Sequence, residues 1–259
     1  MTAAQPILKV VNLEKHFGAV VAAHNISINV HRGEIIGIIG ANGAGKTTFV
    51  NLVTGYLQPD AGSIQFEGRD LVGFEPREVT QSGISRSFQV SQVFSTMSVY
   101  ENVLTALAIA RNHGLEMLQP MHRPGLEERC NEVLKRYRIF EYRDHTVSTL
   151  SQGVRKLLDI AMAVVSEPRI LLLDEPTSGI SVEEKFDLMD IVMEALREDM
   201  VTVLFIEHDM EIVERYVSRV IAFYQGEVIC DESPAEALAD PKVQEFVIGS
   251  RAPAKGGEP

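Results

Sequence analysis

A glycine-rich loop is the segment whose residue types and spacing most clearly indicate chemistry. It consists of Gly40, Ala41, Asn42, Gly43, Ala44, Gly45, Lys46 and Thr47, with Thr48 directly after it. In such a loop the glycines let backbone N–H groups turn toward phosphate oxygens, the lysine reaches the β- and γ-phosphates, and the threonine hydroxyl ligates Mg²⁺. The alternative is a glycine-rich turn that contains a lysine by chance. Average residue usage makes such a match to the whole motif rare. We therefore expect a nucleoside-triphosphate site here.

A pair of carboxylates forms the second candidate. Asp174 and Glu175 follow an apolar run that begins at Ile170. Asp174 is placed to hold Mg²⁺, directly or through water, as the second-strand aspartate does in phosphate-loop enzymes. Glu175 is a candidate general base for the attacking water. The alternative is a strand that simply ends in solvated acidic residues. The presence of the phosphate loop in the same chain disfavours it.

Strands are expected to position both candidates. Residues 34–39, nearly all apolar, predict a strand buried on both faces that leads into the loop, and helical spacing follows the loop. Residues 7–12, 25–30 and 63–67 are short and β-branched, which favours further strands. The last third alternates strands and helices, as a parallel sheet requires. The expected elements there are strand 170–173, helix 182–198, strand 201–206, helix 209–217, a hairpin of 220–224 and 227–230, and a helix after Ser233.

The middle of the chain, about residues 98–166, is predicted to be mostly helical. Cys130, Val133, Leu134 and Tyr137 recur at helical spacing, and another helix should begin near Ser151 and stop before Pro168.

Composition limits the function classes. The 259 residues hold 36 Asp and Glu against 24 Lys and Arg, a net charge of −12, which does not suit a nucleic-acid binder. The cysteines, Cys130 and Cys230, are too few for a disulfide framework and indicate buried thiols in a reducing compartment. With no long apolar run and no signal peptide, the sequence predicts a soluble, cytoplasmic α/β protein.

Four short motifs, taken in order after the loop, resemble the nucleotide-binding subunits of ABC transporters over about residues 7–248. They are Arg86-Ser87-Phe88-Gln89, Leu150-Ser151-Gln152-Gly153, Asp174-Glu175-Pro176-Thr177-Ser178, and Phe205-Ile206-Glu207 followed by His208. The resemblance implies an ATPase that uses ATP and Mg²⁺.

The resemblance also implies roles for single residues. Phe17 would stack on adenine, although an ordinary core phenylalanine is the alternative. Gln89 would touch Mg²⁺ and the attacking water, and His208 would hydrogen-bond the γ-phosphate as a switch. Ser151 and Gly153 would face the γ-phosphate on a second subunit, because a helix start offers free N–H groups to an anion. These roles imply a homodimer or heterodimer around two shared ATP sites.

Two departures from the family pattern stand out. Gln152 occupies a position where glycine is common, and Ser181 stands where an aspartate that aligns the two subunits is usual. Either the site is somewhat weakened, or the partner is a different chain and only one of two sites is fully active.

The segment Gly83–Gln89 and the ending Val243–Gly249 resemble the branched-chain amino-acid uptake group, with urea and amide importers as relatives that share these features. The resemblance implies integral membrane permease partners, an extracytoplasmic solute-binding protein and a peripheral location at the cytoplasmic face of the plasma membrane. Residues 90–101, with Phe94, Met97 and Tyr100, would dock the permease. A soluble ABC-type ATPase in assembly or repair and a small-molecule kinase are the competing interpretations.

The expected fold class is α/β: a phosphate-loop NTPase core with a mixed sheet, an N-terminal antiparallel β part and an inserted α-helical subdomain. Residues 1–250 would form a single nucleotide-binding domain with the helical insertion at about 90–166. Residues 251–259 would be a disordered tail, because they are rich in Pro, Gly and Lys.

Overall fold

The computed structural model describes residues 5–87, 92–111 and 124–249. Gln89 and the expected tail 251–259 lie outside the described residues. The chain divides into two compact units: residues 1–31, 35–73 and 208–259 form unit 1, and residues 32–34 and 74–207 form unit 2.

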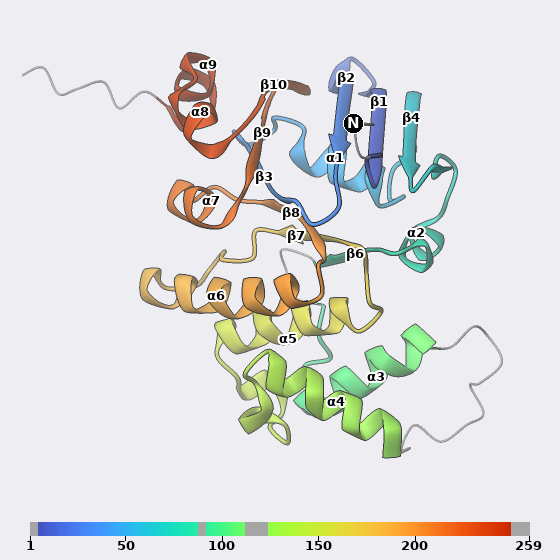
Figure 1. Cartoon of the computed structure of the whole chain (residues 1–259), viewed down its shortest axis with the longest axis vertical. Coiled ribbons are helices and arrows are strands. Elements are labelled where there is room, and N and C mark those ends of the chain that lie inside the picture. Colours follow the sequence, from blue (N-terminus) through green and yellow to red (C-terminus); the bar gives the residue numbers. More distant parts are fainter. Residues whose placement is uncertain (1–4, 88–91, 112–123, 250–259) are drawn as a thin grey trace, which may run out of the picture. The chain divides into compact units, whose positions relative to one another are not determined.

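Unit 1 contains an antiparallel sheet and a mixed one. The antiparallel sheet has the order β2-β1-β4-β5, and β1 pairs with β2 on one side and with β4 on the other (Figure 1). In the mixed sheet β9 pairs antiparallel with β10 and parallel with β3. The strands are β1 (Leu8–Phe17), β2 (Val20–Val30), β3 (Ile35–Gly40), β4 (Ala61–Phe66), β5 (Arg69–Asp70), β9 (Arg219–Tyr224) and β10 (Glu227–Glu232).

The helices of unit 1 are short. They are α1 (Lys46–Val53), α7 (Met210–Tyr216), α8 (Pro234–Ala239) and α9 (Pro241–Val243), with a π-helical turn at Gln244–Ile248. The expected capping box begins α8: Ser233 accepts from the backbone of Glu236, whose side chain reaches back to the Ser233 backbone. Phe49 of α1 and Phe223 of β9 pack with their ring centroids 5.5 Å apart, so the helix after the loop is anchored on the mixed sheet.

Unit 2 is built on three parallel strands, with β7 between β6 and β8. All residues of β7 and β8 are buried, as expected for strands covered on both faces. Figure 1 shows α5 between α6 and the pair formed by α3 and α4. The elements are α2 (Pro76–Ser82), β6 (Ile84–Ser87), α3 (Val99–Arg111), α4 (Pro124–Arg136), α5 (Gln152–Val164), β7 (Ile170–Asp174), α6 (Val182–Glu198) and β8 (Thr202–Ile206), with 3₁₀ turns at Phe140–Tyr142 and Val147–Thr149.

The fold-class prediction is confirmed: the chain is α/β, with an antiparallel N-terminal sheet, a mixed sheet and helices inserted in the middle. The elements that were not predicted include α2 and β6. The helix has only seven residues, and the strand Ile-Ser-Arg-Ser is largely polar, so neither carries a clear hydrophobic period. Their burial depends on partners that lie far away in the sequence.

The two cysteines are free and buried. Burial raises the pKa of the Cys130 thiol to about 12, so this thiol is neutral and unreactive. Cys130 and Leu134 of α4 are buried, as their spacing predicts, and so is Tyr137 directly after the helix, whereas Val133 is partly buried. Among the described residues, no helix is both long enough and apolar enough to cross a membrane.

Candidate functional site

Backbone contacts shape the phosphate loop in unit 1. Gly40 ends β3, and a side chain there would place its Cβ 2.5 Å from the carbonyl oxygen of Phe223. Gly45 has a φ of 104°, and a Cβ there would lie 2.7 Å from the carbonyl oxygen of Ala22. Because backbone atoms cannot withdraw as a flexible side chain can, both positions require glycine. The loop is therefore held in its curve by β2 and β9.

The groups of the loop that are predicted to bind phosphate differ in their exposure. Ala41, Asn42 and Gly43 are exposed, so their backbone is open to a ligand, whereas Ala44 is buried. Lys46 is 6% exposed and donates from Nζ to the carbonyl oxygens of Gly40 at 2.6 Å and of Ala41 at 3.0 Å. The predicted phosphate ligands Gly45, Lys46, Thr47 and Thr48 thus lie together at the start of α1.

Phe17 and His208 are the other predicted ligands in unit 1. Phe17 ends β1 and is 49% exposed, which excludes the core alternative and leaves its ring open to stacking. His208 is exposed in the turn that precedes α7. Both remain predictions as nucleotide contacts.

The acidic pair is held by buried polar contacts in unit 2. Asp174 is 8% exposed, and its Oδ2 accepts a hydrogen bond from Arg86 Nη2 at 2.6 Å. Glu175 follows in the left-handed region with a φ of 48°, and its backbone N–H donates to the carbonyl of Ile206 at 3.0 Å. Such a conformation is costly for a residue with a side chain, and the surrounding structure must hold it in place. The strand end therefore fixes the direction in which Glu175 leaves the sheet.

Glu207 is a site residue for which sequence reasoning gave no role. It is 3% exposed and accepts hydrogen bonds from the Thr177 hydroxyl at 2.6 Å and the Thr177 backbone N–H at 3.1 Å. These bonds tie the end of β8 to the segment that follows Glu175. A buried carboxylate that is hydrogen-bonded in this way has a structural role.

Lys156 of α5 is a second group that sequence reasoning missed. It is 2% exposed, and burial lowers the pKa of its ammonium group, although the charges of nearby carboxylates favour the protonated form. These carboxylates are Asp159, Asp174, Glu175 and Glu207. A lysine at helical spacing inside the motif Leu-Ser-Gln-Gly-Val-Arg-Lys gives no sign that it is buried.

The start of α5 is a capped helix N-terminus with open space at Gly153. Ser151 is its N-cap, with its Oγ accepting from the backbone N–H of Val154 at 3.4 Å. An added Cβ at Gly153 would meet no atom within 4 Å, so the chain's own packing does not require glycine there. Free N–H groups at a helix start attract anions. Ser151 and Gly153 thus present the surface expected for a phosphate from another molecule, and this role remains a prediction.

The two departures from the family pattern lie near each other in unit 2. Gln152 Nε2 donates to the carbonyl oxygen of Ser178 at 3.3 Å, and its side chain fills the space above Gly179. Ser181 is the N-cap of α6, where it accepts from the backbone N–H of Glu184 at 3.3 Å and donates to its carboxylate at 2.9 Å. Ser181 therefore has a local structural role that an aspartate would also satisfy.

The donor set suits Mg²⁺. Among residues 5–87, 92–111 and 124–249, no cluster of three or more His, Cys, Asp or Glu side chains could hold a metal by itself. Mg²⁺ at phosphate sites is held by one or two protein oxygens together with substrate phosphates. The Asp174 carboxylate and the Thr47 hydroxyl are oxygen donors of this kind. Gln89, the third predicted ligand, lies outside the described residues.

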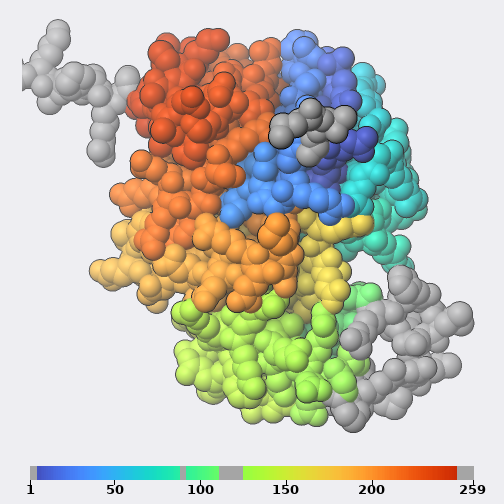
Figure 2. Space-filling view, viewed as in Figure 1, coloured from blue at the N-terminus to red at the C-terminus, as the bar shows by residue number. Residues whose placement is uncertain are grey.

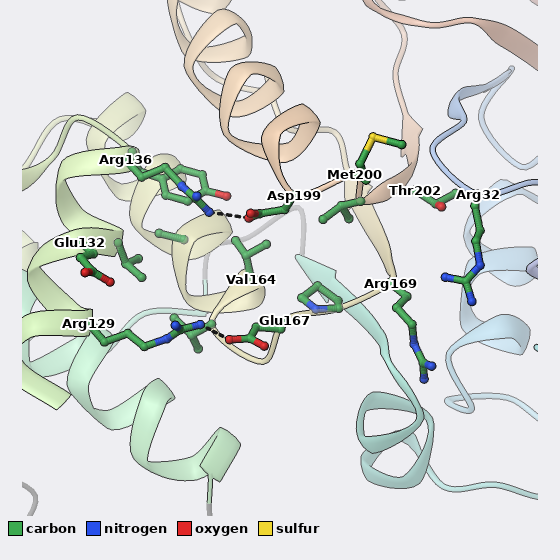
Figure 3. Close-up of a pocket in the computed structure, with 16 residues that line it drawn as sticks. Arg32, Arg129, Glu132, Arg136, Val164, Glu167, Arg169, Asp199, Met200 and Thr202 are labelled. Carbon is green, nitrogen blue, oxygen red and sulfur yellow. Dashed lines mark hydrogen bonds and ion pairs between the residues drawn. The ribbon is translucent and has the colours of Figure 1, made fainter. Parts of the chain in front are cut away.

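Unit 2 also has a cavity of about 790 Å³ at the amino ends of β7 and β8. Figure 3 shows two ion pairs along it, Arg129 with Glu167 and Arg136 with Asp199, which connect α4 to the ends of α5 and α6. The space-filling view also shows α4 and α6 meeting at one face of this unit (Figure 2). The predicted nucleotide ligands do not line this cavity, and Asp174 lies at the opposite, carboxyl end of β7.

The three predicted docking side chains differ in exposure, and Met97 is partly buried. Phe94 is 50% exposed, whereas Tyr100 is 8% exposed and packs under the guanidinium group of Arg143, 4.3 Å from the ring centroid. Of these two, only Phe94 is available to a partner.

A glycine loop between a buried strand and a helix, together with carboxylates after a second buried strand, defines the class of phosphate-loop nucleoside triphosphatases. Residues 23–178 match the family described as ABC transporter. The chain belongs to the ABC transporter family as an ATP-hydrolysing, ATP-binding subunit.

Relatives of known sequence and structure agree with this assignment. The chain is 33% identical to a probable branched-chain amino acid transport ATP-binding protein, LivG, of Archaeoglobus fulgidus, over 95% of this chain and 96% of that protein. It is 32% identical to the high-affinity branched-chain amino acid transport ATP-binding protein BraF of Pseudomonas aeruginosa, over 95% and 99%. The crystal structure of the ADP conformation of MJ1267, an ATP-binding cassette of an ABC transporter, matches with a TM-score of 0.84 at 32% identity, over 93% of this chain and 98% of that one.

Proposed function

We propose that this chain hydrolyses MgATP within a dimer of ATP-binding subunits and thereby powers the import of branched-chain amino acids or a related small polar solute. The geometry of Glu175 is the observation that carries the chemical part of the proposal. Its φ of 48° and its backbone bond to Ile206 fix the backbone from which this carboxylate extends, directly after Asp174. A base that must align one water molecule benefits from such fixed positioning.

ATP would be bound by unit 1. The exposed backbone of Ala41, Asn42 and Gly43 would receive phosphate oxygens, and Lys46 would exchange its loop carbonyl acceptors for the β- and γ-phosphates. The half-exposed ring of Phe17 would stack on adenine.

Mg²⁺ would be held by Thr47, by Asp174 and by Gln89, whose role rests on the family resemblance. When bound, the ion neutralises charge on the β- and γ-phosphates. Glu175 would accept the proton of the attacking water, and His208 would donate a hydrogen bond to the γ-phosphate.

A second ATP-binding subunit would complete each site. Ser151 and Gly153 would face the γ-phosphate bound to that subunit, which agrees with the open space around Gly153. A related cassette, MJ0796, has been solved as a dimer with ADP and phosphate bound, and it matches with a TM-score of 0.75 at 25% identity over 88% of this chain and 98% of that one. The partner could be a second copy or a different chain.

The assignment to an importer rests on the relatives named as branched-chain amino acid transport ATP-binding proteins. In such an assembly the chain would dock on integral membrane permease subunits at the cytoplasmic face of the membrane, with Phe94 in the contact. A solute-binding protein on the other side of the membrane would select the substrate. Purification of the chain from gently solubilised membranes should recover integral membrane permeases, and recovery of none would contradict this part of the proposal.

Glu175→Gln tests the chemical part. The amide cannot accept a proton, so kcat for ATP hydrolysis should fall by at least about 100-fold. ATP binding should persist, and a stable dimer should form in ATP, as seen by size-exclusion chromatography. The matched control is Glu67→Gln, which makes the same change at an exposed glutamate that also has a left-handed φ, 49°. Unchanged hydrolysis in Glu175→Gln would overturn the assigned role.

A further inference from the structure

One carboxylate of α5 holds the chain on both sides of residues 88–91. Oδ2 of Asp159 accepts a hydrogen bond from the Ser87 hydroxyl at 3.0 Å, and its Oδ1 accepts one from the backbone N–H of Gln92 at 2.8 Å. Asp159 is 5% exposed and Ser87 is 1% exposed, so the Ser87 bond is shielded from water. Hydrogen bonds to a buried, charged acceptor are among the stronger ones in proteins.

The place of Asp159 on α5 relates its hydrogen bonds to two parts of unit 2 with predicted roles. These are the start of α5 and the acidic residues that follow β7. Asp159 lies on the same helix as Ser151 and Gly153, whose N–H groups form the predicted contact with a second subunit's phosphate. Lys156, three residues earlier and one helical turn away, is buried and feels the charges of Asp159 and of the acidic residues after β7 and β8. The carboxylate that holds Ser87 and Gln92 and the predicted catalytic carboxylate thus both favour the protonated form of this lysine.

We propose that Asp159 is a positioning residue that ties α5 to Ser87 and Gln92, which flank Gln89 in the sequence, so that phosphate contact at the start of α5 is coupled to both of these residues. This inference rests on the proposed function. Asp159 is not one of the predicted nucleotide or metal ligands. Because both of its carboxylate oxygens accept hydrogen bonds, a shift of α5 would also move Ser87 and Gln92.

Asp159→Ala and Asp159→Asn test the inference in the full-length chain. Alanine removes both acceptors, whereas asparagine keeps one carbonyl oxygen and loses the charge. We expect kcat for ATP hydrolysis to fall about tenfold in Asp159→Ala, since small displacements of catalytic groups have effects of this size, and to fall less in Asp159→Asn. KM for ATP should stay within about twofold of the unaltered value, because Phe17 and the phosphate loop, the residues predicted to bind the chain's own ATP, lie in unit 1.

Hydrogen exchange at the Gln92 amide gives a second readout that does not depend on activity. Exchange at this amide should speed up about tenfold in Asp159→Ala, but not in Ser87→Ala, which leaves the bond from Gln92 intact. Asp187→Asn is the matched control, because it makes the same chemical change at an exposed aspartate on α6. If Asp159→Ala does not fold, Asp159→Leu, which also removes both acceptor oxygens but keeps more of the side-chain volume, carries both measurements.

Two results would overturn the inference: a kcat equal to that of Asp187→Asn, or an unchanged rate of exchange at Gln92. A fall in kcat together with a large rise in KM would also contradict it, since general disruption would then explain the loss. Failure of the proposed function gives a different pattern, because the unaltered chain would then hydrolyse no ATP while Asp159→Ala still altered exchange at Gln92.

Discussion

In unit 1 the phosphate loop is held by backbone atoms, whereas in unit 2 the acidic residues after β7 are held by buried side chains. Gly40 and Gly45 lie against the carbonyl oxygens of Phe223 and Ala22. Because these oxygens belong to the backbone, the contacts do not depend on which side chains the two partner residues carry. Asp174, by contrast, depends on the guanidinium group of Arg86, 88 residues earlier in the sequence. A backbone-held loop restricts its own residue types and so appears in the sequence as a motif. A site held by side chains depends on partners that its own motif does not contain.

Arg86→Met should have the largest effect on stability in this comparison. It leaves the buried Asp174 carboxylate without its guanidinium partner, so the free energy of unfolding should fall by about 3 kcal/mol. The loss, measured by urea unfolding, should be smaller in saturating MgATP, which supplies a cation for the same carboxylate. Arg138→Met is the control, because its ion pair with Glu194 is 61% exposed on both sides and should contribute at most about 1 kcal/mol. Equal losses with and without MgATP would argue against Asp174 as a metal ligand.

Gly40→Ala probes the backbone-held region in the same way. A methyl group 2.5 Å from a carbonyl oxygen must displace β9 or the loop, which should cost about 2 kcal/mol in the free energy of unfolding. Gly43→Ala is the control within the same loop: an added Cβ there meets nothing within 4 Å, and only its φ of 80° is unfavourable, at about 1 kcal/mol. Urea unfolding of the two variants without nucleotide measures the difference. If Gly43→Ala were as costly as Gly40→Ala, contact with β9 would not be what fixes the loop.

The same contrast explains how much could be predicted from the sequence. The loop, the buried strand before it and the helix after it were predictable, because glycine spacing and apolar runs are local signals. Helix 182–198 was predicted with the observed bounds, since Ser181 caps it and its apolar period is regular. The buried positions of Lys156 and Asp159 could not be predicted, because charged residues on a helix usually face water and these two are buried only by tertiary packing. The roles of Arg86 and Glu207 were missed because Asp174 and Thr177, which they hold, are distant in sequence.

Ser181 gives the smallest expected effect and separates local structure from assembly. Ser181→Ala removes the N-cap of α6 and should lower the free energy of unfolding by about 1 kcal/mol, whereas Ser181→Asp keeps a capping oxygen and should change it by less than about 0.5 kcal/mol. The family resemblance gives aspartate at this position a role between subunits, so Ser181→Asp should tighten the ATP-bound dimer a few-fold, about 1 kcal/mol, as measured by analytical ultracentrifugation in the Glu175→Gln background. An unchanged dimer would mean that residue 181 acts only as a helix cap. A tighter dimer with unchanged unfolding would mean that serine at this position limits closure of the assembly and leaves the fold intact.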